Sequence, residues 1–90
     1  MREPSDHIKR KHIVQYAKAN KGLNNSDIRL ILSRCPIKES WREIAAMILI
    51  EGKDEGCVAD FTGYSKSQIV RIFYCVLEIF CAVGHKLNML

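Results

Sequence analysis

The fold is decided by the stretch Glu55-Gly-Cys-Val-Ala-Asp-Phe-Thr-Gly-Tyr-Ser-Lys-Ser-Gln-Ile-Val-Arg-Ile-Phe73. It has the residues that two helices crossing through a tight turn require. Ala59 is small enough for a second helix to pack across it, and Gly63 can take the left-handed backbone conformation without a Cβ clash. The apolar positions at which the two helices would bury side chains against each other are Val58, Ile69 and Ile72. We therefore predict a helix-turn-helix between residues 55 and 73.

Polar and basic side chains follow the turn glycine. Ser65 is placed to cap the second helix, because its hydroxyl can accept a backbone N–H bond at the helix start. The first turns of that helix would project Lys66, Ser67, Gln68 and Arg71. In the major groove of DNA, glutamine pairs with adenine and lysine or arginine pairs with guanine, and a helix N-terminus favours a phosphate. A structural helix pair is the alternative, but here the small, turn, apolar and exposed positions are all filled at once.

Apolar residues also recur at helical spacing in the chain before this stretch. No segment shows the two-residue alternation of a half-buried strand. A first helix is expected from about Ser5 to about Asn20, with Gly22 as its stop. A second begins after the capping residues at 24–26 and ends at Pro36. The face that the first helix would turn to the core carries Ile8, His12, Tyr16 and Ala19.

The third and last helices complete the fold. Ser40 followed by Glu43 predicts a capping box at the start of the third helix, which Gly52 ends. The last helix is expected over residues 65–83, with Gly84 as its stop. The sequence therefore predicts an all-α fold of about five helices that contains a helix-turn-helix.

Ninety residues are the size of one domain, since a chain this short has room for one core. We divide residues 1–90 into a basic N-terminal helix over 1–22, supporting helices over 23–52, and the helix-turn-helix with its long last helix over 53–83. Residues 1–22 hold six basic and two acidic side chains and therefore account for the whole net charge of +4. That segment suggests a polyanion partner, although a solvated helix face explains it almost as well.

Cysteine and histidine spacings give no metal site. The four cysteines show no C-x-x-C pair, and the three histidines do not complete a zinc site. Free thiols in a reducing cytoplasm are the simpler interpretation. The most apolar stretch, residues 69–83, is interrupted by Arg71 and Glu78, and no signal peptide is evident. We therefore expect a cytoplasmic protein without a cofactor or a membrane contact, and the lack of a nucleophile-and-base pattern argues against an enzyme.

A family resemblance is carried by Glu43-Ile44-Ala45, Leu49, Gly52-Lys53, Ala59, Gly63, Ser65-Lys66, Val76 and Phe80. Through these residues the segment 23–80 resembles, without gaps, the plasmid transcriptional repressors of the KorA (TrfB) type. It is more faintly similar to the PapB-like regulators of fimbrial adhesin operons, in which a helix ends in glycine eleven residues before a turn glycine. Both resemblances imply a dimeric helix-turn-helix regulator. The likeness does not extend to the C-terminal dimerisation region of the KorA type, so it implies no dimer contact.

The last helix offers a dimer surface of its own. One apolar stripe suffices to hold a helix on a small domain, yet a second stripe is formed by Val70, Tyr74, Leu77 and Cys81. This second stripe would be exposed in a monomer, so we predict a two-fold dimer packed partly through it and through the tail residues Leu87, Met89 and Leu90. The alternative is a last helix buried within its own domain by the N-terminal helix.

Together these patterns predict a sequence-specific regulator of transcription that binds double-stranded DNA, most simply a homodimeric repressor on a palindromic operator. We expect the start of the last helix to contact the DNA bases and Lys53 and Ser65 to contact phosphates. The basic first helix would add electrostatic attraction to the DNA backbone. The predicted DNA-binding residues are Lys9, Arg10, Lys11, Lys53, Tyr64, Ser65, Lys66, Ser67, Gln68 and Arg71. The alternative is an adaptor or anti-activator that binds another regulatory protein through its apolar last helix. Salt separates the two, because phosphate contacts weaken steeply as salt rises.

Overall fold

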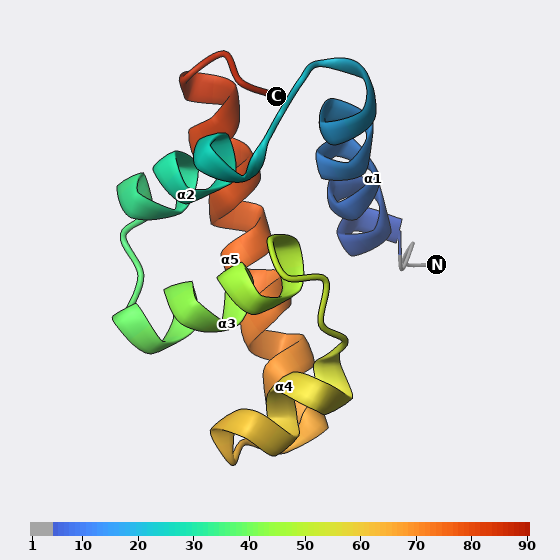
Figure 1. Ribbon diagram of the computed structural model, residues 1–90, viewed down its shortest axis with the longest axis vertical. Coiled ribbons are helices and arrows are strands. Elements are labelled where there is room, and N and C mark those ends of the chain that lie inside the picture. Colours follow the sequence, from blue (N-terminus) through green and yellow to red (C-terminus); the bar gives the residue numbers. More distant parts are fainter. Residues whose placement is uncertain (1–4) are drawn as a thin grey trace.

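Five helices make up the described part of the chain in this computed structural model, which covers the backbone of residues 5–90 and the side chains of residues 10–90. In chain order they are α1 (Ser5–Asn20), α2 (Asn25–Arg34), α3 (Glu39–Leu49), α4 (Glu55–Thr62) and α5 (Lys66–Lys86) (Figure 1). No strand occurs between residues 5 and 90. The predicted all-α class is therefore confirmed.

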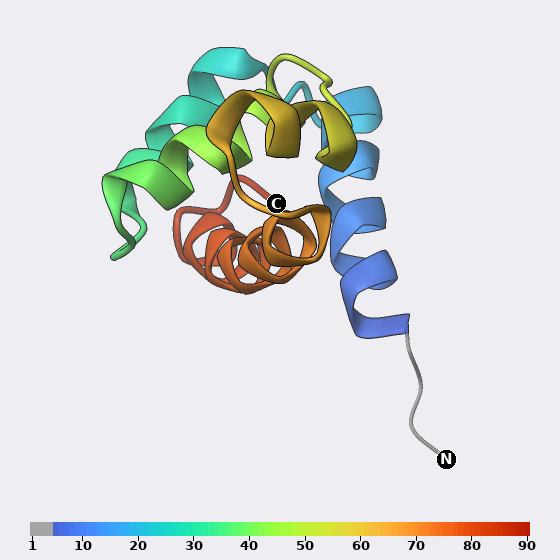
Figure 2. The same ribbon diagram turned by 90° about the horizontal axis from the view of Figure 1, so that it is seen from below.

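The central element is α5. The helices α2, α3 and α4 form a layer over one side of it, and α1 runs beside it on another (Figure 2). The buried residues of α5 recur every three or four positions and are Ile69, Ile72, Phe73, Val76, Leu77, Phe80, Cys81 and Gly84. The side of α5 opposite the three-helix layer is uncovered (Figure 2). In the middle of α5 the exposed residues recur every three or four positions and are Arg71, Cys75, Glu78 and Ala82.

One hydrophobic core joins all five helices. The side chains that the other helices bury in it are Val14 and Ala17 of α1, Ile28, Ile31 and Leu32 of α2, Ile44, Ala45 and Met47 of α3, and Val58 and Ala59 of α4. Among the residues whose side chains are described, no polar or charged side chain is buried. Apolar burial is therefore the main source of stability.

The length of α5 exceeds the prediction, because the helix continues through Gly84 to Lys86. By length and composition alone, α5 could cross a membrane, with a mean hydropathy of 1.6 over its most apolar window. The core helix of a folded domain passes the same test. Of that window, 39% is buried inside the molecule, and eight residues of α5 are buried against the other helices.

The prediction that Gly84 stops α5 is wrong. Gly84 is buried inside the helix, and a Cβ atom there would lie 2.5 Å from Cδ1 of Leu90. Asn88 takes the left-handed conformation (φ +58°) instead, and the N–H of Met89 donates to the carbonyl of Gly84 at 2.9 Å. This pattern satisfies a terminal carbonyl. Glycine at position 84 thus makes room for the returning tail.

The predicted capping box of α3 is also wrong. The helix begins at Glu39, its N-cap is Lys38, and no side chain caps it. Arg42 fixes this start, because its guanidinium donates to the carbonyls of Leu32 (2.9 Å) and Cys35 (3.0 Å), which lie at the end of α2. A tertiary contact therefore overrides the local capping signal.

The core-facing side of α1 differs from the prediction. Val14 and Ala17 are buried, whereas Tyr16 is 60% exposed, and His12 and Ala19 are exposed as well. The small side chain of Ala17, with Val14 one turn earlier, lets α1 pack closely against α5. The side chain of Ile8, the fourth member of the predicted face, lies outside the described residues. The predicted bounds of α1 are confirmed.

Candidate nucleic-acid interface

The connection between α4 and α5 is a tight turn at Gly63. This glycine has φ +85°, and its N–H donates to the carbonyl of Ala59 at 2.9 Å. The hydroxyl of Thr62 donates to the carbonyl of Val58 at 2.7 Å, which explains a polar residue at the end of α4. The apolar positions Val58, Ile69 and Ile72 are buried. The predicted roles of Ala59, Gly63 and these three residues are therefore confirmed.

The start of α5 is held by a reciprocal capping box. The hydroxyl of Ser65 accepts the N–H of Gln68 at 3.2 Å, and Oε1 of Gln68 accepts the N–H of Ser65 at 2.9 Å. A bidentate pair with adenine needs both the carbonyl and the amide of glutamine, so this arrangement does not fit the predicted reading role of Gln68. The Ser-x-x-Gln spacing was visible in the sequence and is itself a capping signal.

Three of the predicted contact residues stand together on the outside of α5. Lys66, Ser67 and Arg71 are exposed. With the half-buried Val70 and Tyr74 they line a shallow hollow of about 530 Å³, which we call the α5 hollow. No acidic side chain lines it. The first two turns of α5 therefore offer two cations and a hydroxyl on one open surface.

Two other predicted contacts lie apart from the α5 hollow. Lys53, in the connection between α3 and α4, pairs with Glu51 at 3.7 Å. Tyr64 lies in the turn beside Ser65 and is 37% exposed. Neither residue lines the α5 hollow. The structure therefore does not bring Lys53 into the predicted interface, and it leaves Tyr64 at its edge.

The basic residues of α1 join helices together. Nη2 of Arg10 lies 3.9 Å from the carboxylate of Glu78 in α5, and Nζ of Lys11 lies 4.0 Å from the carboxylate of Glu55 in α4. Both cations are partly buried, and Nζ of Lys11 is also 5.8 Å from the ring centroid of Phe73. A phosphate contact would have to compete with these ion pairs. The side chain of Lys9 lies outside the described residues.

The second stripe of α5 is largely covered. Leu77 is fully buried and Cys81 is 5% exposed, while Val70 and Tyr74 are half-buried. The thiol of Cys81 donates to the carbonyl of Arg10 at 3.9 Å, which places α1 over this part of the stripe. The prediction that the stripe is exposed is therefore wrong for Leu77 and Cys81, because both are buried within the same chain.

The four cysteines are free thiols. Burial raises the pKa of Cys35 above its ordinary value of 9.0, and the nearby Arg42 only partly opposes this. Burial likewise raises the pKa of Cys81, with Arg10 opposing. Within the described part of the chain, no three His, Cys, Asp or Glu side chains group closely enough to hold a metal ion.

The α5 hollow and the turn before it make up the candidate site. No family model, curated protein or solved structure matches the chain. The function is therefore inferred from the residues and their geometry. Sequence reasoning missed one feature close to the site, the exposed ring of Phe61 in α4, which is 77% accessible.

Proposed function

We propose that this chain is a DNA-binding regulator of transcription that places the first two turns of α5 in the major groove. The observation that carries the proposal is the exposure of Lys66, Ser67 and Arg71 on one surface without an acidic neighbour in the α5 hollow. Charged donors of this kind bind phosphate oxygens and guanine edges strongly. The start of α5 lies with α4 at one end of the molecule (Figure 1), where a duplex can approach it.

The spacing of the two cations suits a groove. Lys66 and Arg71 are separated by about 7.5 Å along the helix axis, which is about two base-pair steps. Ser65 satisfies the N–H of Gln68, and the N–H groups of Lys66 and Ser67 precede it in the first turn without an intrahelical acceptor. These two groups suit a phosphate oxygen. In this proposal Gln68 holds the helix start, and Lys66 and Arg71 contact the DNA.

A homodimer on a palindromic operator is part of the proposal, because two half-sites about one DNA turn apart match a two-fold protein. Its contact differs from the one predicted from sequence. Leu77 and Cys81 are buried, and Val70 and Tyr74 line the α5 hollow, which DNA would cover. The same burial leaves only Val70 and Tyr74 of that stripe for an adaptor that would use its last helix.

The test is selection from a random duplex pool, followed by fluorescence-anisotropy titration of the selected and an unrelated duplex at two salt concentrations. Wild type is expected to prefer the selected duplex and to bind more weakly at higher salt. The Lys66→Ala, Arg71→Ala double variant is expected to lose at least tenfold in affinity, since a base contact contributes about 1–3 kcal/mol.

A matched control is Lys86→Ala, which removes an exposed lysine at the opposite end of the same helix, about 30 Å from Lys66. This variant is expected to bind almost as wild type does. The control removes one positive charge and the double variant removes two, so a loss of binding free energy in the control that is half that of the double variant would show that net charge, and not the start of α5, governs binding. No binding of wild type to duplex DNA at low salt would refute the proposal.

A further inference from the structure

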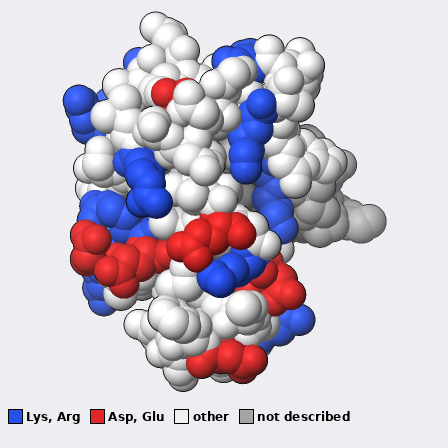
Figure 3. Space-filling view, viewed as in Figure 1, with Lys and Arg blue, Asp and Glu red and all other residues white. Residues whose placement is uncertain are grey.

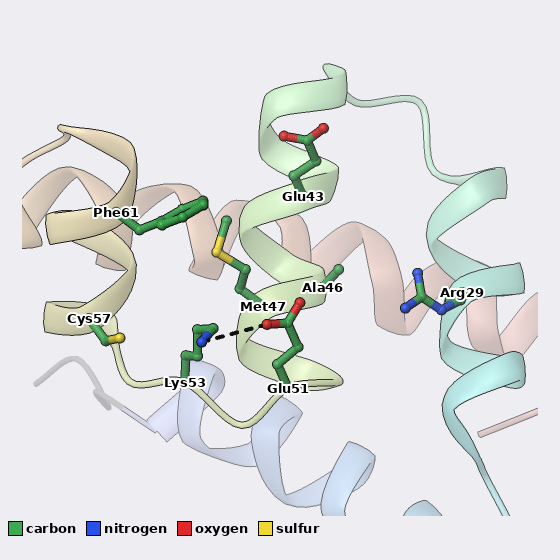
Figure 4. Close-up of a pocket in the computed structure, with 8 residues that line it drawn as sticks. All are labelled: Arg29, Glu43, Ala46, Met47, Glu51, Lys53, Cys57 and Phe61. Atoms are coloured by element: carbon green, nitrogen blue, oxygen red, sulfur yellow. Dashed lines mark ion pairs between the residues drawn. The ribbon is translucent and has the colours of Figure 1, made fainter.

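A groove between α3 and α4 takes no part in the proposed DNA contact. It has a volume of about 470 Å³, and its apolar lining consists of Ala46, Met47 and Phe61, with Cys57 beside them (Figure 4). We call it the α3/α4 groove. In Figure 4, α5 passes behind it. The groove therefore opens on the outer side of the helix layer, away from the uncovered side of α5.

Phe61 is the most exposed large hydrophobic side chain among those described, at 77%. Its helix is anchored through the neighbouring Val58 and Ala59, which are buried. The ring points toward Met47 of α3 (Figure 4), so it forms one wall of the groove without filling it. An exposed aromatic ring beside an apolar floor is typical of an anchor position in a protein interface.

The groove is lined by two acidic residues, Glu43 and Glu51, and by two basic ones, Lys53 and Arg29 of α2. The α3–α4 segment around it is more acidic. Residues 39–62 carry six acidic and two basic side chains, a net charge of −4 in a chain of +4. The six acidic residues are Glu39, Glu43, Glu51, Asp54, Glu55 and Asp60. Figure 3 shows acidic side chains crossing this face as a band. A polyanion is therefore a poor occupant, and a cationic one is favoured.

The two basic residues of this segment are already engaged. Arg42 donates to backbone carbonyls and pairs with Glu39, and Lys53 pairs with Glu51. Glu43, at the edge of the groove, has no ion pair with any residue of the described chain. Its carboxylate can therefore pair with a cation brought by a partner.

We propose that the α3/α4 groove docks a basic amphipathic helix of another protein. Apolar side chains one turn apart would enter beside Phe61 and Met47, which is the helix-in-groove mode of recognition. Lysine or arginine side chains that flank them would reach Glu43 and would compete with Lys53 for Glu51. The proposal is independent of DNA binding, because the groove and the α5 hollow share no residue.

The probe is a fluorescein-labelled leucine-lysine peptide of about 18 residues, with leucines at helical i, i+3, i+4 and i+7 spacing. A scrambled peptide of the same composition and a leucine-glutamate peptide serve as controls. In an anisotropy titration, wild-type protein is expected to bind the amphipathic basic peptide at least tenfold more tightly than either control.

Two variants locate the contact. Phe61→Ser is expected to weaken binding at least tenfold, and Glu43→Gln with Glu51→Gln is expected to weaken it and to flatten its salt dependence. Because Phe61 is exposed, its variant should keep the wild-type circular dichroism spectrum and melting temperature. The matched control is Tyr16→Ser, which removes an aromatic side chain that is 60% exposed on α1, and it should bind as wild type.

Three outcomes would overturn the proposal. The first is equal binding of the scrambled peptide, and the second is unchanged binding by Phe61→Ser. The third is a wild-type dimer in sedimentation that Phe61→Ser converts to a monomer, because a second copy of the chain would then occupy the groove. The Lys66→Ala, Arg71→Ala variant should bind the peptide as wild type does, so failure of the DNA proposal leaves this result interpretable.

Discussion

Single residues of one type differ sharply in their surroundings, and the cysteines show this best. Cys57 and Cys75 are exposed, whereas Cys35 and Cys81 are buried. The thiol of Cys35 donates to the carbonyl of Ile31 at 3.2 Å. Burial raises the pKa of both buried thiols, so little of the reactive thiolate forms at neutral pH. The same functional group is therefore accessible at two positions and shielded at the other two.

We predict that two of the four thiols react rapidly with Ellman's reagent in the native protein and that the other two react only on unfolding. The reaction is followed by absorbance, and mass spectrometry of alkylated peptides identifies the sites. Cys57→Ser and Cys75→Ser should each remove one rapid equivalent. Rapid modification of Cys35 or Cys81 would show that α1 or α2 opens readily from α5.

Helices in this chain take their bounds from two kinds of signal. Where the signal is local, the sequence was sufficient: Asn24 caps α2 through the N–H of Asp27 at 2.9 Å, and Ser65 caps α5. Where a contact between distant residues sets the bound of a helix, the sequence was not sufficient to predict it. The start of α3 depends on Arg42 reaching the end of α2, and Gly84 lies within α5 because Leu90 folds back over it.

The candidate site was predictable to the same extent. The exposure of Lys66 and Arg71 follows from helical spacing, because the apolar face of α5 fixes which side is left to solvent. The engagement of Arg10 and Lys11 by carboxylates of α5 and α4 does not follow, since it depends on how α1 packs. The exposure of Phe61 was equally hidden, because an apolar residue in a short helix is ordinarily taken for core.

The capping box at the start of α5 gives a prediction at the scale of the helix. Gln68→Ala removes one of its two hydrogen bonds and is expected to cost about 1 kcal/mol of unfolding free energy. Its effect on DNA should be a similar, small loss for selected and unrelated duplexes. Arg71→Ala should instead cost little stability and reduce discrimination between the duplexes. Urea denaturation and anisotropy measure the two effects, and a specific loss of discrimination in Gln68→Ala would restore its role as a base reader.

The whole molecule is organised around α5, which contacts each of the other four helices. The apolar residues on the second side of this helix can be buried in two ways, by a partner subunit or by other helices of the same chain. The structure shows enclosure at Leu77 and Cys81, and α1 covers the second stripe at Cys81. Stability of the isolated chain should therefore depend on α5 more than on any other helix.

Leu77→Ala tests this enclosure. Removing a fully buried leucine is expected to cost about 2–5 kcal/mol, a large part of the roughly 5–15 kcal/mol that stabilises a small domain. Val70→Ala, on the same stripe but half-buried, should cost less. The melting temperature of Leu77→Ala should fall by the same amount at all protein concentrations. A loss that shrinks as concentration rises would place Leu77 at a subunit contact instead.

The separation of charge along the chain also has a kinetic consequence. Residues 39–62 carry −4, which leaves +8 for the rest, so charge is distributed unevenly along the chain. In the field of a polyanion, an encounter through the acidic band is repelled and an encounter through the other faces is attracted. In the proposed DNA complex, this field would favour approaches that turn the acidic band, and Phe61 with it, away from the duplex before any specific contact forms.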